Sequence, residues 1–357
     1  MPDTTATPGH PKRRAIARAA GGALLALAIS LAGLWGAFAL WFQLPASAPV
    51  RIAAITAWCL LGMAALSTLP GSRRWRRRVL PLFGLALLGL LAWWSTLAPS
   101  HERDWADDVA RLLETDVEGS RVTLHNVRNF DWRSEADYTP RWETRAYDLD
   151  DLVSADLVLS YWMGPAIAHT LVSFGFGDGE RVVFSLEIRK ERHERFSAIG
   201  GFFRRFEQVL VAADERDIVR VRSNARGEDV YLYRLAVAPD ALRELFLGYT
   251  AEANRLRHEP RFYNTLTSNC TTIVFDLARK ISPGLPLDYR LLLSGYFAEY
   301  VHDLGGLAPG HGFAELQARG RIVARARAAD ASGEDFPQAI RRGVPGIPAR
   351  SPHREAR

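Results

Sequence analysis

Three long apolar runs in the first hundred residues constrain this chain more than any other feature. They cover residues 19–42, 53–69 and 79–98. The first and third runs are long enough to cross the roughly 30 Å hydrocarbon core of a bilayer as helices. The second run is at the short end of the range, which tilting or bilayer thinning can accommodate. We therefore expect three transmembrane helices, with residues 1–100 as a membrane anchor.

Basic residues around these runs predict their orientation. The two clusters are Lys12, Arg13, Arg14 and Arg18 before the first run, and Arg73, Arg74, Arg76, Arg77 and Arg78 between the second and third. The connection between the first two runs has only Arg51. Because basic loops stay on the cytoplasmic side, the N-terminus is expected in the cytoplasm and the chain after about Ser100 outside. A cleaved signal peptide is the alternative for the first run, with residues 46–48 as the cleavage site. That run is too long for an ordinary signal core, so we prefer a retained helix.

Charge is divided unevenly between the two parts of the chain. Residues 1–100 contain ten Lys and Arg but one acidic residue, whereas residues 101–357 contain 35 basic and 39 acidic residues. The basic character therefore comes from the membrane anchor, and nucleic acid is not an expected partner. The chain has two cysteines, Cys59 and Cys270, which excludes a disulfide scaffold and a Cys-rich zinc or iron–sulfur site.

Residues 101–342 are expected to form an exported α+β domain, because predicted strands come first and predicted helices follow. A short polar helix is expected within residues 101–116. Strands are expected at residues 121–130, 157–162, 166–176, 181–190, 206–213, 218–222 and 230–237. Helices are expected over residues 239–258 and from about Asn269 to Pro283. Residues 343–357 are expected to be a disordered basic tail.

Cys270 is the strongest candidate for chemistry. Ser268 or Asn269 is a suitable N-cap, which places Cys270 in the first turn of a helix. The positive end of the helix dipole favours a thiolate there, and the free N–H groups could bind an oxyanion. The alternative is a small buried cysteine that packs the helix. The capped position favours a nucleophile.

A nucleophilic cysteine needs a base, and His169 is the preferred candidate. It lies within a long apolar strand, residues 166–172, where an imidazole is costly without a polar partner. A core histidine with an ordinary hydrogen-bond partner is the alternative. His125, also in a strand pattern, is the reserve base.

Glu187 is the candidate third member of a triad. A three-residue turn, Gly177-Asp178-Gly179, would pair 169 with 187, whereas a two-residue turn would put Glu187 on the other face. In the first register the carboxylate can orient the imidazole. The alternative is an exposed Glu187 paired with Arg189 or Arg192.

Other patterns in the sequence give weaker indications of a functional site. Ser173 lacks the strand-to-helix setting of a serine nucleophile. Asp148, Asp150 and Asp151 read as a solvated loop, and no spacing predicts a metal site. The glycines of residues 175–179 form a turn and not a phosphate loop. No cofactor or metal is therefore expected.

Several motifs in order resemble one known family. They are residues 126–130 (NVRNF), 138–143 (YTPRWE), 168–176 (AHTLVSFGF), 187–191 (EIRKE) and 262–272 (FYNTLTSNCTT). Together they resemble the Lnb N-terminal periplasmic domain family over residues 117–343. The resemblance implies a bacterial protein of the inner membrane, similar to a lipoprotein N-acyltransferase that works through a thiol. It also implies kinship with circularly permuted papain-like proteins of the NlpC/P60 type, in which His precedes Cys.

The resemblance implies that Cys270 is the nucleophile and His169 the base, while Glu187 rests on the register argument. Asn269, Asn264, Tyr263 and Arg189 are expected to support this site. Three functions are open to such a chain: a thiol acyltransferase or lipid-ester hydrolase, a papain-like peptidase or amidase of cell-wall peptides, and a non-catalytic tethered interaction domain. The expected partners are membrane lipids, with lipoproteins or peptidoglycan peptides as further candidates.

Overall fold

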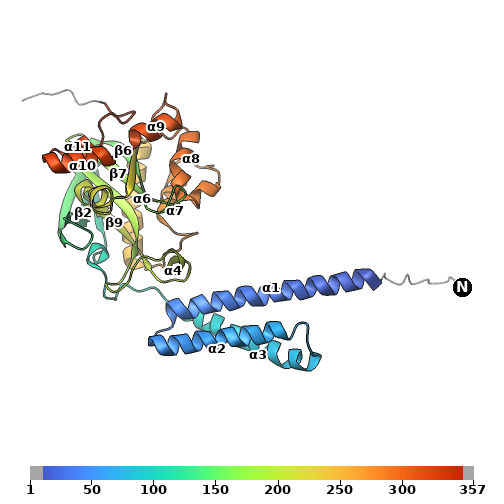
Figure 1. The fold of residues 1–357 in the computed structure, drawn as a ribbon. Coiled ribbons are helices and arrows are strands. Elements are labelled where there is room, and N and C mark those ends of the chain that lie inside the picture. The colour runs from blue at the N-terminus through green and yellow to red at the C-terminus, as the bar shows by residue number, and fades with distance from the viewer. Residues whose placement is uncertain (1–10, 349–357) are drawn as a thin grey trace, which may run out of the picture. The chain divides into compact units, whose positions relative to one another are not determined.

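The structure is a computed structural model and describes residues 11–348. It divides into two compact units, which are described separately here (Figure 1). Of the described residues, the helical unit comprises 11–99 and 203–205, and the sheet unit comprises 100–202 and 206–348.

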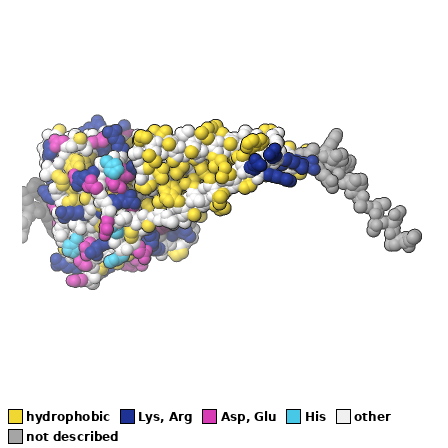
Figure 2. All heavy atoms as spheres, turned by 90° about the horizontal axis from the view of Figure 1, so that it is seen from below, with side chains coloured by type: hydrophobic (Ala, Val, Ile, Leu, Met, Phe, Trp, Pro, Cys, Tyr) yellow, Lys and Arg dark blue, Asp and Glu magenta, His cyan; other side chains and the backbone are white. Residues whose placement is uncertain are grey.

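The helical unit contains the three expected apolar helices. They are α1 (Pro11–Gln43), α2 (Ala48–Ser67) and α3 (Arg73–Thr96). Each is long and apolar enough to cross a membrane. Most of their large apolar side chains point outward, as helices facing lipid require, and Figure 2 shows hydrophobic side chains along their flank with basic side chains gathered at one end. The prediction of three such helices is confirmed.

Close packing holds the three helices together. The ring of Trp58 in α2 lies against Gly36 of α1, where a Cβ atom would be about 2.5 Å from the ring. Its Nε1 donates to the carbonyl of Gly33 (2.8 Å), and its ring centroid is 5.2 Å from that of Phe83 in α3. Small residues that allow backbones to approach are the usual means of packing helices in lipid.

Residues 203–205 belong to the helical unit although they are distant in sequence. The Phe203 ring lies 5.4 Å from that of Phe38, 5.8 Å from that of Phe42 and 6.4 Å from that of Trp94. The guanidinium of Arg204 donates to the carbonyl of Trp94 (2.8 Å). This segment therefore packs against the C-terminal ends of α1 and α3.

The sheet unit is built on one eight-stranded sheet with helices on both faces. The strand order is β1-β2-β9-β8-β7-β6-β10, and β5 also pairs with β2. The strands are β1 (Glu114–Glu118), β2 (Arg121–Arg128), β5 (Trp142–Asp148), β6 (Leu152–Tyr161), β7 (Ala168–Phe176), β8 (Arg181–Arg189), β9 (Glu207–Ala213) and β10 (Asp229–Arg234). The pairings are antiparallel except that of β2 with β9. A two-stranded sheet, β3 (Asp131–Trp132) and β4 (Tyr138–Thr139), completes the strands.

Alternation along the strands builds a core on each face. Even-numbered residues of β7 and β8, such as Phe174 and Phe184, pack against Phe246 and Tyr249 of α6. Odd-numbered residues, such as Leu171, pack on the other face. The first face is covered by α6 (Pro239–His258), α7 (Cys270–Ile281), α8 (Phe297–Asp303) and α9 (Phe313–Gly320). The second is covered by α5 (Glu215–Arg220), α10 (Val323–Ser332) and α11 (Phe336–Ala339). The α+β prediction is confirmed.

Two local predictions are wrong. Residues 218–222, expected as a strand, lie in α5 and the π-helical turn Val221–Ala225. Asp214 caps α5 by accepting from the N–H of Arg216. Of the β-branched residues that suggested a strand, Ile218 and Val219 are buried in the core of the second face, and Val221 is buried beside Phe130 and Trp132. Within residues 101–116, expected as a polar helix, the structure has one short 3-10 turn, Asp107–Val109, before β1 begins.

Ordered structure continues into the C-terminal segment that was expected to be disordered. Of the tail predicted as disordered over residues 343–357, residues 349–357 lie outside the described residues. Residues 343–348 are described, and Val344 is buried in the second core beside Ile340. The Gly343 carbonyl accepts a hydrogen bond from Arg319 (2.9 Å). Apolar residues spaced through a polar sequence thus hold this segment against the sheet unit.

Candidate active site

Cys270 is the first residue of α7, and its position is set by a capping box. Asn269 Oδ1 accepts from the N–H groups of Thr271 (2.9 Å) and Thr272 (3.0 Å). The hydroxyl of Thr272 in turn accepts from the N–H of Asn269 (2.8 Å). Reciprocal capping of this kind fixes the first turn of a helix. The sulfur is therefore held at the positive end of the α7 dipole.

The loop before Cys270 is closed on itself. Asn264 Oδ1 accepts from the N–H groups of Leu266 and Thr267 (both 3.0 Å), and the backbones of Asn264 and Ser268 pair with each other. The side-chain amide of Gln208 in β9 bonds to Ser268 from behind. These contacts fix the path of the chain into α7.

His169 and Glu187 meet across β7 and β8. Val172 pairs with Phe184, and Gly175 with Arg181, which confirms the register predicted from the three-residue turn. His169 Nε2 lies 3.1 Å from Glu187 Oε1 and 2.7 Å from Ser185 Oγ, and Ser185 donates to Glu187 (2.8 Å). Since Nε2 is engaged in this way, Nδ1 is the ring nitrogen left for the thiol.

Arg222 binds the same oxygen of Glu187 as His169 and Ser185 do. It lies in the π-helical turn, donates to Glu187 Oε1 (2.7 Å) and also to the carbonyl of Ile218 (2.8 Å). The carboxylate is thus fixed by a guanidinium and an imidazole. A buried carboxylate with two such donors is stabilised in its charged form.

His169 lies on β7 within the sheet and Cys270 on α7, which covers the first face, and both residues line one cavity. The paired register of β7 and β8 ends at Val172 and Phe184, so no hydrogen-bonded ladder lies between the two strands at the His169 end. Thr170 Oγ1 contacts Thr271 Oγ1 (3.1 Å), which ties β7 to the first turn of α7. This contact joins the residues that follow the base and the nucleophile.

The start of β7 is fixed by a second contact. Ser294 Oγ donates to the carbonyl of Ala168 (2.7 Å) and accepts from its N–H (3.0 Å). The neighbouring Gly295 lies so close to Pro165 that a Cβ atom would approach its carbonyl oxygen to 2.0 Å. A glycine is therefore required here to keep β7, and with it His169, in place.

The cavity that contains the sulfur has a volume of about 660 Å³. Its apolar walls come from Trp162, Met163, Ile167, Phe196 and Leu292. Its polar lining includes Arg195, Arg222, Arg226, Glu228 and Tyr263 in addition to His169 and Glu187. Cys270 itself is about 5% exposed, so small or extended molecules reach it through this cavity.

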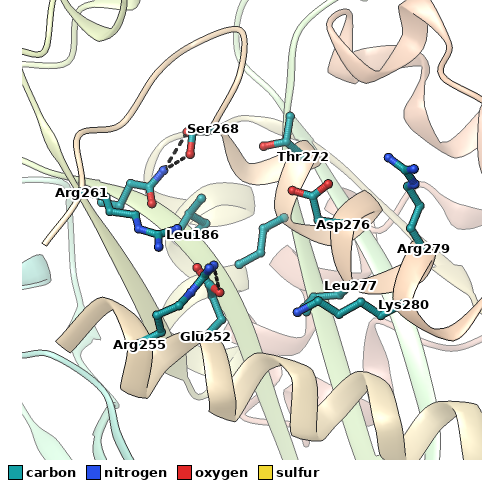
Figure 3. Close-up of a pocket in the computed structure, with 12 residues that line it drawn as sticks. Leu186, Glu252, Arg255, Arg261, Ser268, Thr272, Asp276, Leu277, Arg279 and Lys280 are labelled. Carbon is teal, nitrogen blue, oxygen red and sulfur yellow. Dashed lines mark hydrogen bonds and ion pairs between the residues drawn. The ribbon is translucent and has the colours of Figure 1, made fainter. Parts of the chain in front are cut away.

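A second cavity of about 450 Å³ lies behind the loop that leads into α7. Figure 3 shows Arg255 paired with Glu252 on one side, and Thr272 and Asp276 projecting from α7 on the other. Four basic and two acidic side chains line it, and neither Cys270 nor His169 does. We therefore place the chemistry in the larger cavity.

The charges of the three residues favour an ion pair. Burial alone would lower the pKa of His169, but the charges of Glu187 and Cys270 outweigh it and raise this pKa to about 9. Burial would raise the pKa of the Cys270 thiol, but the charge of His169, its hydrogen bond and the N–H of Thr170 lower it. Burial likewise opposes ionisation of Glu187, and His169 and Arg222 nevertheless hold its pKa well below the usual range. The expected state is thiolate, imidazolium and carboxylate.

Alkylation of Cys270 by iodoacetamide is expected to rise less steeply with pH than that of a free thiol, because the charge of His169 lowers the pKa of Cys270. An ordinary thiol with a pKa of about 8.5 would react roughly tenfold faster for each pH unit between about 6 and 8. Glu187→Gln removes a charge that supports the imidazolium, so alkylation should become more steeply pH-dependent. Mass spectrometry of the Cys270 peptide in a Cys59→Ala background gives the rates.

The matched control for this measurement is Glu191→Gln, because Glu191 pairs with Arg103 and not with His169. It should leave the pH profile unchanged. A wild-type profile that rises through pH 8.5 like that of a free thiol would contradict the ion pair.

Comparison with known families adds to this geometry. Residues 138–295 match the family described as the Lnb N-terminal periplasmic domain. This region is an Lnb domain. With its three apolar helices, the chain is therefore a membrane-anchored protein with a periplasmic domain. No curated protein and no solved structure matches it.

The structure brings some of the predicted supporting residues to the site of the Lnb domain and not others. Asn269 and Asn264 shape the helix start, and Tyr263 lines the cavity with a pKa raised by burial and by the neighbouring charge of Cys270. Arg189 instead donates to the carbonyls of Val109 (3.0 Å) and Ala110 (2.7 Å). Its role lies in anchoring the segment before β1.

The other sequence candidates lie elsewhere. His125 in β2 contacts Asp116 (2.9 Å) and does not line the cavity. Ser173 is buried and bonds to Glu215. Asp148 caps a short 3-10 turn that contains Asp150. Within residues 11–348, no three His, Cys, Asp or Glu side chains are placed to hold a metal ion.

Sequence reasoning missed Ser185 and Arg222 as parts of the site. Ser185 shares a strand face with Glu187, so alternation along β8 already placed it beside the base. Arg222 had no such signal, because residues 218–222 were expected as a strand. Only the helical conformation after β9 brings its guanidinium to Glu187.

Proposed function

We propose that the protein is a periplasmic thiol acyltransferase or lipid-ester hydrolase that works through an acyl-Cys270 intermediate. One observation carries this proposal: the thiol at a capped helix N-terminus interacts with an imidazole held by Glu187, and both line a cavity with apolar walls. A thiolate with an adjacent imidazolium is the usual state of an activated cysteine nucleophile. Apolar walls suit the hydrocarbon chain of a lipid.

The first step would be attack of the Cys270 thiolate on the carbonyl carbon of an ester. A C–S bond forms, the carbonyl becomes an oxyanion, and the acyl C–O bond then breaks. The imidazolium of His169 gives its proton to the leaving alkoxide and becomes neutral. Glu187 keeps the ring oriented, and the released product is an alcohol.

The second step would return the enzyme to its starting state. An amine attacks the thioester carbonyl, the neutral imidazole takes a proton from the nitrogen, and the C–S bond breaks to restore the thiolate. With water in place of the amine, the same step is hydrolysis. The chemistry needs no cofactor in either case.

The helix N-terminus could also stabilise the oxyanion. The capping box uses the N–H groups of Thr271 and Thr272, so the N–H of Cys270 is the first helical donor that the cap does not occupy. Removal of one oxyanion donor in other enzymes costs about a hundred- to a thousand-fold in kcat.

The alternatives are less well supported. A papain-like peptidase or amidase of cell-wall peptides would be served by a polar open cleft, whereas Trp162, Met163 and Phe196 line this cavity. A non-catalytic domain would not need a thiol whose pKa is lowered by a neighbouring imidazole. The papain-like relationship remains part of the proposal and rests on the order of His169 before Cys270.

We also propose that the chain is oriented with its N-terminus in the cytoplasm of a bacterial inner membrane. The basic clusters before α1 and at the start of α3 support this orientation. The three crossings then deliver residue 100 to the periplasm.

The proposal is tested by intact-mass analysis of the full chain in nanodiscs. With diacyl phospholipids or a diacylated lipopeptide as donor, the wild-type chain should gain one acyl mass, and hydroxylamine should remove it as expected for a thioester. Cys59→Ala should behave as wild type, and Cys270→Ala should gain nothing. Release of peptide from muropeptides without any acyl adduct would favour the amidase instead.

A further inference from the structure

Six large exposed apolar side chains lie along the Cys270 cavity or in the adjoining residues 198–202. They are Trp162, Met163, Phe196, Ile199, Phe202 and Leu292, which we call the apolar rim, and each is between 41% and 56% exposed. Four of them line the cavity, and Ile199 and Phe202 continue the surface along α4 (Ala198–Phe202). Contiguous exposed apolar surface of this kind marks an interaction site.

The connections between the two units indicate which surface the rim could contact. The sheet unit begins at Ser100, four residues after α3 ends at Thr96, and four extended residues span at most about 14 Å. The segment 203–205 belongs to the helical unit, where Phe203 packs against Phe42 and Trp94. Phe202, the last residue of α4, is covalently bonded to that segment.

The two chain connections from the helical unit, at Ser100 and at Phe206, enter the sheet unit at the start of β9. The N–H of Ser100 bonds to Glu207 Oε1 (3.2 Å), directly after the second connection returns at Phe206. The helix α4 also packs on the loop before the nucleophile, because Thr265 Oγ1 donates to the carbonyl of Ala198 (3.1 Å). Two residues of the rim, Ile199 and Phe202 in α4, therefore lie directly before the segment 203–205 of the helical unit in the chain.

The composition of the apolar rim is also typical of a surface that contacts a membrane. Trp162 and Phe196 form an edge-to-face pair with centroids 6.0 Å apart, and both rings are exposed. Aromatic side chains favour the interface between hydrocarbon and headgroups. We infer that the apolar rim inserts into the surface of the phospholipid bilayer, so that the Cys270 cavity opens toward lipid. This inference concerns the surface and does not depend on the activity of Cys270.

Photolabelling of the full chain in nanodiscs tests the inference. A phospholipid with a diazirine near the top of its acyl chain is activated, and adducts are mapped by mass spectrometry. Peptides with residues 162–163 and 196–202 should be labelled about tenfold more than the peptide with Val153, an apolar residue at the other end of β6 that is more exposed (63%) than any residue of the rim. Phe196→Asp with Ile199→Asp should abolish labelling of the rim only.

Three outcomes decide the result. The same labelling in Cys270→Ala would support the inference, since adducts then cannot depend on acyl transfer. If labelling of the wild-type chain is confined to α1, α2 and α3, and the rim is labelled no more than Val153, the inference is wrong. This outcome needs no variant. A loss of labelling at the rim in the double variant, with labelling of the three helices retained, shows that the chain remains embedded.

Discussion

Cys270→Ala is expected to reduce turnover of a lipid-ester donor by about 10⁴-fold or more, because the variant has no atom that can form the acyl intermediate. His169→Ala should lose about a hundred- to ten-thousand-fold, the usual contribution of acid–base assistance. The double variant should be no slower than Cys270→Ala alone, since the two residues act in one step. Initial rates with a fluorogenic ester in nanodiscs give all three values.

The pH profile of wild-type turnover gives an independent check. Because the pKa of His169 is raised to about 9, its imidazolium persists below that pH and can protonate the leaving alkoxide. Turnover should therefore fall as pH rises above about 9. Residual activity of Cys270→Ala near the wild-type level, or a Cys59→Ala variant that is equally impaired, would contradict the assignment of the nucleophile.

Arg341→Ala is expected to destabilise the sheet unit by about 3–5 kcal/mol, the usual result of removing one partner from a buried ion pair. Arg341 reaches Asp156 Oδ2 (2.8 Å) and Glu215 Oε1 (2.5 Å), and both carboxylates are fully buried. Asp156 keeps Arg234, but Glu215 would lose its closest cation. Urea unfolding of the full chain in micelles, followed by tryptophan fluorescence, measures the change.

The neighbouring Arg342 is the matched control. It is exposed and pairs with Glu334, so Arg342→Ala should change stability by no more than about 0.5 kcal/mol. Adding Glu215→Gln to Arg341→Ala should restore part of the loss, since a neutral amide needs no cation. Equal effects of the two arginine variants would show that the buried network is not stabilising.

The same network gives stability a defined pH dependence. Burial would raise the pKa values of Asp156 and Glu215, but the charge of Arg341 keeps both below their ordinary values. A carboxylate whose pKa is lower in the folded state stabilises the fold above its unfolded pKa, and this contribution is lost as pH falls through the folded value. The Arg341→Ala penalty should accordingly shrink below about pH 4.

Local turn chemistry made part of the site predictable. The turn Gly177-Asp178-Gly179 fixes the register of β7 and β8, and alternation then puts His169 opposite Glu187. The N-cap pattern likewise placed Cys270 at a helix start. Each of these features depends on a few neighbouring residues, which is why sequence alone could indicate them.

The features that sequence missed depend on contacts between distant segments. Residues 218–222 contain β-branched residues typical of a strand. In the helical segment that they form, Ile218 and Val219 are buried with residues of α10 and α11, and Val221 with Phe130 and Trp132. Arg222 entered the site only through that helix. The meeting of His169 with Cys270 also depends on Ser294 and on the Thr170–Thr271 contact, which join residues about a hundred positions apart.

The reach of Arg341 has a practical consequence for dissecting this protein. The family match covers residues 138–295, yet the cation that neutralises Asp156 and Glu215 lies 46 positions past its end. Strands β1 and β2 likewise precede the matched region while completing the same sheet. A truncation to the boundaries of the family match would therefore leave the buried carboxylates of Asp156 and Glu215 without the charge of Arg341. A soluble derivative for crystallography should retain the chain through at least residue 348.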